Sequence, residues 1–148
     1  AVSSSDKKLD KVKALGADIT VDRTNQEVLK IVKKTTDGRG ADIVFEHVGQ
    51  ATWTISMRSL ARGGRLVTCG ATTGPKVDLN LTHLFFKQQS VLGSTMGSQA
   101  ALKDAMDLLR QKKIKPVVDR VFPMAEVKYA HEYLESEGQF GKVILTCE

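Results

Sequence analysis

Two kinds of apolar spacing alternate along the chain. Apolar residues three or four positions apart predict helices that follow Ser5 and Thr24, and further helices that include Trp53, Leu102 and Val127. Between them, short apolar runs bounded by glycine or proline predict strands at residues 17–21, 42–48, 65–69, 90–96, 117–122 and 142–146. Strands that alternate with helices in this way are typical of βαβ units and a parallel sheet, so the predicted fold class is α/β.

Local sequence signals support the first two helices. Ser5 is a suitable N-cap, with Asp6 in the first turn, and Gly16 suits the position just past the helix end. Residues Thr24 to Glu27 fit a capping box before the second helix.

The predicted strands also indicate where a ligand would bind. Residues 43–45 and 66–67 are apolar without alternation, which predicts a sheet covered by helices on both faces. In such sheets ligands bind beyond the carboxyl ends of the strands. The segments to search are therefore residues 3–8, 22–23, 47–50, 69–74 and 94–98.

The composition is that of an ordinary folded domain. The chain has 148 residues, of which 41% are hydrophobic and 26% charged, and this excludes a disordered tail, a collagen-like chain and a disulfide scaffold. The net charge is 22 − 17 = +5, but the lysines are spread over the predicted helices and aromatic residues make up only 5%. We therefore expect solvated helix faces and no nucleic-acid partner.

Membrane and secretory locations are also not indicated. The apolar runs are shorter than the roughly 18 residues of a membrane span, and the N-terminus lacks a signal-peptide core. Cys69 and Cys147 show no paired spacing, so we expect a cytoplasmic protein without membrane contact. Ala1 in place of Met suggests a processed or partial chain.

A complete pyrophosphate-binding loop is missing. The pattern G-x-G-x-x-G would have to lie between a strand and a helix. Gly38-Arg39-Gly40 instead precedes a strand and has Ile43 at the third glycine position, and the glycines at 93 and 97 have the wrong spacing.

Ser3, Ser4 and Ser5, with Lys7 and Lys8 close by, suggest a phosphate contact. They follow what looks like the end of a strand, where a dinucleotide fold meets the adenosine ribose. Hydroxyls with a cation suit a 2′-phosphate, whereas NAD would favour a carboxylate at this point. A plain N-cap with surface lysines explains the same residues, and both interpretations can hold together.

Small residues at two strand ends are the other candidates. Val48-Gly49 and Cys69-Gly70-Ala71 would let a cofactor approach the backbone, although on their own they are more simply explained as ordinary turn glycines. We expect Cys69 to be a small buried side chain. Glu46 and His47 point to opposite faces of their strand and cannot act as a pair, and no cluster of residues has metal-ligand spacing.

Five segments in order resemble the medium-chain dehydrogenases, and most closely the zinc-type alcohol dehydrogenase and quinone oxidoreductase branch. These segments are Leu-Gly-Ala-Asp at 15–18, Gly-Arg-Gly-Ala-Asp-Ile-Val-Phe at 38–45, Gly-Gly-Arg-Leu-Val at 63–67, Leu-Gly-Ser-Thr-Met-Gly at 92–97 and Phe-Gly-Lys-Val-Ile-Leu at 140–145. The resemblance covers essentially the whole chain.

The resemblance implies a Rossmann-type doubly wound parallel sheet, truncated at its N-terminus. The first βα unit, with its glycine fingerprint, would lie upstream of Ala1, together with a catalytic domain and any zinc ligands. Residues 1–115 would be a partial NAD(P)-binding domain, and residues 116–148 a C-terminal segment that returns to the absent catalytic domain.

The resemblance also implies residue roles. Ser3, Ser4, Ser5 and Lys8 match the segment at the adenosine ribose or its 2′-phosphate, and Asp22 matches a position near the adenine. The positions along the nicotinamide, its ribose and the substrate side correspond to Val48, Gly49, Cys69, Gly70, Ala71, Ser94 and Thr95. Lys142 follows the Phe-Gly pair that reaches the cofactor in some members. No catalytic residue and no metal ligand is assigned to this chain. Family dimers pair the sixth strand, so we expect a homodimer through the edge strand from Val91 to Met96.

The implied activity belongs to a parent enzyme. It would transfer a hydride between NADP(H), with NAD less favoured, and an alcohol, carbonyl or quinone substrate, with zinc present in members that use it. We expect the isolated chain to lack dehydrogenase activity and to bind adenosine phosphates weakly at most. The alternative is a non-catalytic Rossmann-like fragment that serves dimerisation or partner binding. A methyltransferase-like domain is disfavoured, because it needs a glycine-rich first loop and an acid after the second strand.

Overall fold

The computed structural model describes residues 1–136 and 138–147. The chain divides into two compact units, Ala1–Met96 and Gly97–Glu148, and each is described by itself. The boundary after residue 115 drawn from the resemblance stays a prediction.

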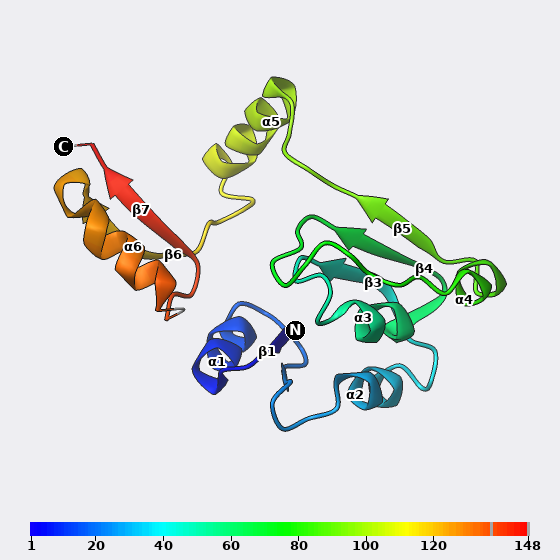
Figure 1. Cartoon of the computed structure of the whole chain (residues 1–148). Helices are drawn as coiled ribbons and strands as arrows, with labels where there is room; N and C mark the ends of the chain where they lie inside the picture. Colours follow the sequence, from blue (N-terminus) through cyan, green and yellow to red (C-terminus); the bar gives the residue numbers. More distant parts are fainter. Residues whose placement is uncertain (137, 148) are drawn as a thin grey trace. The chain divides into compact units, whose positions relative to one another are not determined.

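The first unit alternates strands and helices (Figure 1). In chain order these are β1 (Val2–Ser3), α1 (Asp6–Ala14), β2 (Val21–Asp22), α2 (Val28–Thr35), β3 (Ala41–Glu46), α3 (Trp53–Ser59), β4 (Leu60–Thr68), α4 (Leu81–Phe86) and β5 (Ser90–Gly93). β1 pairs with β2, and β3, β4 and β5 form a second sheet in that order. All of these pairings are parallel, which confirms the α/β, Rossmann-like fold class.

The core of this unit lies between α3 and one face of the β3–β4–β5 sheet (Figure 1). Trp53, Leu60 and Leu66 form its buried cluster, and Val44 and Met57 pack against them. Val44 and Leu66 are opposite each other in the β3–β4 pairing, so alternate residues of both strands face α3. Burial of these side chains is the main source of stability for this layer.

The opposite face of the same sheet is open in the described chain. Ile43 is 59% exposed and Phe45 is 68% exposed, although both are large apolar residues. The sequence pattern predicted cover on both faces, and within this unit only the α3 face has it.

Several element boundaries differ from the prediction. In place of the strand expected at residues 17–21 the structure has β2, Val21–Asp22, although the Ala1 amino group also donates to the Ile19 carbonyl at 2.7 Å. The strand expected to reach Met96 ends at Gly93, and Met96 has a positive φ of 40°. The predicted capping box is also wrong, because α2 begins at Val28 and Thr24 bonds Asp22 instead.

The second unit contains α5 (Gln99–Arg110), β6 (Val118–Pro123), a short 3-10 turn (Met124–Glu126), α6 (Val127–Glu135) and β7 (Lys142–Thr146). β6 and β7 pair in parallel. Tyr133 of α6 packs on this pair, because its hydroxyl donates to Asp119 Oδ2 at 2.6 Å and its ring lies 4.0 Å below the Arg120 guanidinium. Among the described residues, no helix is long and apolar enough to cross a membrane.

Candidate functional site

Three strands of the first unit end side by side. The pairing register places Glu46 of β3 beside Thr68 of β4, and Thr68 beside Gly93 of β5. Because the strands are parallel, the segments 47–52, 69–74 and 94–98 all leave from the same edge of the sheet. The structure thus brings together the strand-end candidates of this sheet, which are Val48, Gly49, Cys69, Gly70, Ala71, Ser94 and Thr95.

Backbone hydrogen bonds join the loop after β3 to the loop after β4. The Val48 carbonyl oxygen accepts from both the amide and the hydroxyl of Thr73, each at 2.8 Å. The Thr73 hydroxyl oxygen accepts in turn from the Ala51 amide at 3.0 Å, and the Gln50 amide donates to the Gly74 carbonyl at 3.2 Å. We call residues 47–52 and 69–74, joined in this way, the loop clasp.

Close packing within the loop clasp explains two of the glycines. Gly49 has a φ of +89°, and a Cβ on it would lie 2.6 Å from the Gly74 carbonyl oxygen. A Cβ on Gly70 would lie 3.0 Å from the His47 carbonyl oxygen. Their turn role is therefore structural, and close approach of a cofactor to the same backbone stays a prediction.

Glu46 is the residue that the sequence interpretation missed. Its carboxylate is at the end of β3, and the residue is only 3% exposed. Oε1 accepts from the amides of Val48 at 2.7 Å and Gly49 at 3.1 Å, and from the Thr52 hydroxyl at 2.9 Å. Oε2 accepts from the same Thr52 hydroxyl at 3.0 Å and from the hydroxyl of Ser56.

These hydrogen bonds decide the charge state of Glu46. Burial acts to raise the pKa of the carboxyl, but the hydrogen bonds from Ser56, Val48, Gly49 and Thr52 favour the ionised form and together hold the pKa below its ordinary value. Glu46 is therefore a carboxylate at neutral pH. The available sequence signal was its position: two residues after Val44, it falls on the buried face of the strand, where an acid needs partners.

The other strand pair carries the adenosine-side candidates. Ser3 is paired with Asp22, and the Ser5 carbonyl accepts from the amides of Lys8 and Leu9 at the start of α1. Ser5 is the N-cap, as predicted, although its side chain makes no cap hydrogen bond. Ser4 is exposed, and Ser3, Ser5 and Lys8 are half-buried.

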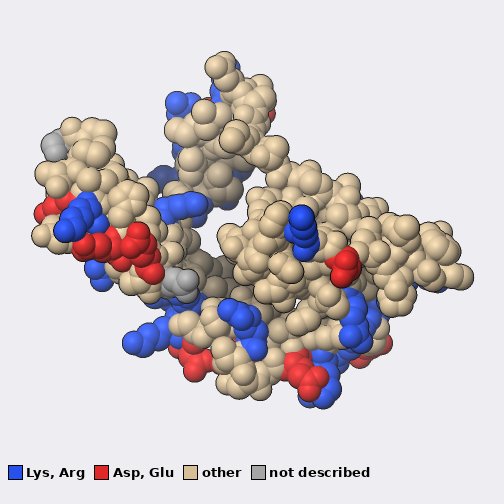
Figure 2. All heavy atoms as spheres, viewed as in Figure 1, with Lys and Arg blue, Asp and Glu red and all other residues tan. Residues whose placement is uncertain are grey.

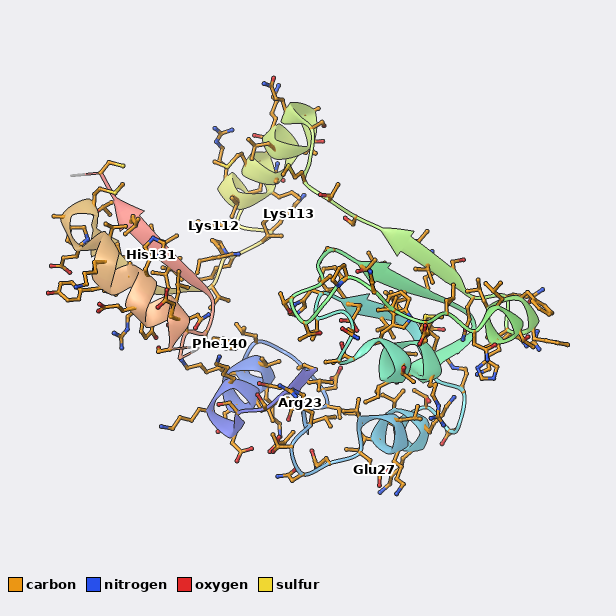
Figure 3. The ribbon with its side chains drawn as sticks, viewed as in Figure 1. Arg23, Glu27, Lys112, Lys113, His131 and Phe140 are labelled. Carbon is orange, nitrogen blue, oxygen red and sulfur yellow. The ribbon has the colours of Figure 1, made fainter. Side chains whose placement is uncertain are left out.

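The Asp22 side chain accepts hydrogen bonds within the turn that follows β2. Its Oδ1 accepts from the Thr24 hydroxyl at 2.7 Å and from the Thr24 amide at 2.9 Å, and these bonds lower the pKa of its carboxyl. The next residue, Arg23, donates its amide to the Ser3 carbonyl at 2.9 Å, so this exposed cation stands at the end of β1 as well (Figure 3). Sequence reasoning searched this position but did not select Arg23.

One candidate lies differently from the expectation, and another lies in the second unit. Cys69 is exposed, not buried, because it follows the last residue of β4 and leaves the sheet at the loop clasp. Lys142 belongs to the second unit, where it is exposed at the start of β7 and donates its amide to the Val117 carbonyl at 2.8 Å. A cofactor contact of Lys142 stays a prediction.

The described side chains show neither a basic surface nor a cluster of metal ligands. On the face shown in Figure 2, Lys and Arg side chains are scattered within each unit, and acidic side chains lie among them. Within residues 1–136 and 138–147, no group of three or more His, Cys, Asp or Glu side chains is placed to hold a metal ion. These residues therefore do not fit a zinc site, and we derive no step through zinc.

The parallel sheet and its carboxyl edge agree with the comparison with known families. The sequence model described as zinc-binding dehydrogenase matches residues 1–111. The chain belongs to this family. A zinc-type alcohol dehydrogenase-like protein of Schizosaccharomyces pombe is 33% identical over 151 residues, which cover 99% of the chain and 44% of that protein.

Solved structures share the fold as well. A crystal structure of an NAD-dependent alcohol dehydrogenase has a TM-score of 0.89 and 38% identity, and the match covers 100% of this chain and 43% of that one. A 2-octenoyl-CoA carboxylase reductase, solved with NADP and 2-octenoyl-CoA, has a TM-score of 0.88 and 29% identity, with 99% and 37% covered. The chain spans less than half the length of each of these proteins.

Proposed function

We propose that the chain is the cofactor-binding portion of an oxidoreductase that transfers a hydride between NADP(H) and an alcohol, carbonyl or quinone substrate. The observation that carries the proposal is the shared carboxyl edge of β3, β4 and β5, where the loop clasp presents Val48, Gly70 and Ala71 together. Ligands of parallel α/β sheets bind beyond this edge.

The nicotinamide half of the cofactor would lie along the loop clasp. Gly70 and Ala71 have little or no side chain, so a flat ring can approach the backbone there. Ser94 is joined to the same edge, because its amide donates to the Thr68 carbonyl at 2.9 Å. When bound, the nicotinamide supplies or accepts the hydride, while these residues bind and orient it.

The preference for NADP(H) rests on the other strand pair. Ser3 and Ser4 offer hydroxyls at the end of β1, and Lys8 and Arg23 offer cations nearby, a set that suits the 2′-phosphate of the adenosine ribose. Asp22 belongs to β2, and its Oδ1 accepts two hydrogen bonds from Thr24. The acid that would select the ribose hydroxyls of NAD is expected at the end of β1, where the chain has serines instead.

Isothermal titration of the chain with adenosine 2′,5′-bisphosphate and with adenosine 5′-phosphate tests this preference. We expect weak binding of the bisphosphate, with dissociation constants that are lower by tenfold or more than for the monophosphate. Equal affinities would contradict a 2′-phosphate site, and the preference for NADP(H) over NAD would then have no support.

A second candidate is a fragment that serves dimerisation without catalysis. The observation that favours it is the outer strand β5, all four residues of which are exposed, next to α4 with its exposed Leu81, Phe85 and Phe86. We propose that a second copy of the chain pairs with β5. A dimer alone fits both functions, whereas a dimer without any nucleotide binding favours the second.

A further inference from the structure

We propose that Glu46 is a positioning residue, whose carboxylate holds the loop clasp in the shape that receives the nicotinamide half of the cofactor. This inference rests on the proposed function. Glu46 itself is not placed to touch a ligand, because it is buried and both its oxygens are occupied by donors from the chain.

The first step is the span of its hydrogen bonds. All four donor groups lie between residues 48 and 56, so one carboxylate ties the loop after β3 to the first turns of α3. Hydrogen bonds to a buried ionised group are stronger than neutral ones. The loop therefore has its conformation set from inside the protein, before any ligand is present.

Second, both main-chain polar groups of Val48 are hydrogen-bonded. The Val48 amide donates to Glu46, and the Val48 carbonyl accepts from the amide and hydroxyl of Thr73. Val48 is thus held at both ends, from β3 on one side and from the loop after β4 on the other. A change at Glu46 is transmitted through Val48 to the second loop of the clasp.

The third step is what a neutral side chain would do. A carboxylate accepts at both oxygens, whereas the amide of a glutamine accepts at one oxygen and donates at its nitrogen. Glu46→Gln keeps the shape but removes the negative charge, so the bonds from the Val48 and Gly49 amides are no longer charge-assisted. The Thr52 and Ser56 hydroxyls must also turn to accept from the new amide nitrogen, so the loop is held less firmly.

The test compares Glu46→Gln with two matched controls in the complete 148-residue chain. Asp42→Asn removes an exposed carboxylate from the same strand, and Val44→Ala weakens the same core layer without touching the loop. Two readouts are followed by NMR: hydrogen exchange of the Val48 and Gly49 amides, and the shifts that NADPH induces in the clasp and in residues 3–8.

For Glu46→Gln we expect at least tenfold faster exchange at both amides and loss of the NADPH-induced shifts at residues 69–74, while those at residues 3–8 remain. Neither control should lose the shifts at residues 69–74. Wild-type exchange and shifts in Glu46→Gln would overturn the inference, and so would equal losses in Val44→Ala.

If the wild-type chain shows no NADPH-induced shifts, the proposed function fails, and unchanged exchange in Glu46→Gln then overturns the holding role independently. If Glu46→Gln does not fold, Ser56→Ala takes its place. It removes one donor and should produce a smaller change in the same direction, and wild-type behaviour of Ser56→Ala would contradict the inference.

Discussion

Gly49 lies against Gly74 so closely that a Cβ on Gly49 would meet the Gly74 carbonyl oxygen at 2.6 Å. Gly49→Ala must therefore push the two loops apart as well as strain a φ of +89°. Gly63→Ala is the matched control, because Gly63 has a φ of +71° with open space around it. We expect Gly63→Ala to cost about 1–2 kcal/mol through backbone strain, and Gly49→Ala to cost about 1–3 kcal/mol more through overpacking.

Urea unfolding followed by the fluorescence of the single tryptophan, Trp53, measures both costs. Equal destabilisation of the two variants would mean that the loops separate without resistance, and the loop clasp would then not be a rigid feature.

The stability of the protein should depend on the ionisation of Glu46. Its hydrogen bonds hold the pKa below the ordinary value of about 4.3, in spite of the opposing effect of burial. A lowered pKa means that the stabilising contribution is complete above the ordinary value and is lost as the pH falls through the lowered one. We expect the difference in unfolding free energy between wild type and Glu46→Gln to shrink below about pH 4. A difference that grows with acidification would show that the carboxyl prefers to be neutral in the folded state.

Lys8 should distinguish the two nicotinamide cofactors in the intact parent enzyme. Loss of a hydrogen bond to a charged group costs about 1.5–3 kcal/mol, so Lys8→Glu should weaken NADPH binding about tenfold or more. NADH binding should change much less. Lys13→Glu makes the same charge change at an exposed position in the last turn of α1 and should affect neither cofactor strongly. Equal losses of NADPH and NADH affinity in Lys8→Glu would make Lys8 a general surface charge.

The outer strand β5 should carry the homodimer contact. Charged residues on an edge strand oppose pairing with another chain. Leu92→Lys should therefore shift the protein toward monomer in sedimentation equilibrium, while Leu102→Lys, an exposed leucine of α5, should not. A dimer unaffected by Leu92→Lys would place the contact elsewhere.

Much of the fold could be predicted from residue patterns, because strand and helix periodicity act locally. The helix at Trp53 and the strands at Ile43 and Leu66 were found in this way. The bounds of the strand at residues 17–21 were not, because pairing depends on a segment elsewhere in the chain. The exposure of Phe45 was missed for a related reason, because an apolar run does not indicate which other segment packs against it.

The edge that carries the candidate site could be predicted from the sequence, but its internal contacts could not. Strand ends indicated which segments share one edge of the sheet, because parallel strands end together. The two loops at this edge are joined by hydrogen bonds to main-chain atoms, such as the bond from the Thr73 amide to the Val48 carbonyl. The type of a residue does not indicate which partner its main-chain groups will have. Glu46 was considered only as a catalytic partner of His47, which its direction on the strand excludes. Its position on the buried face of the strand could have indicated that its carboxylate needs hydrogen-bond donors.

We propose above that NADP(H) binds at the carboxyl ends of β1, β3 and β4. NMR titration of the isotope-labelled 148-residue chain with millimolar NADPH tests it most directly, because weak binding is visible residue by residue. The account predicts shifts at residues 3–8, 47–52 and 69–74 together. Absence of shifts at these segments, or shifts confined to the unit Gly97–Glu148, would contradict it.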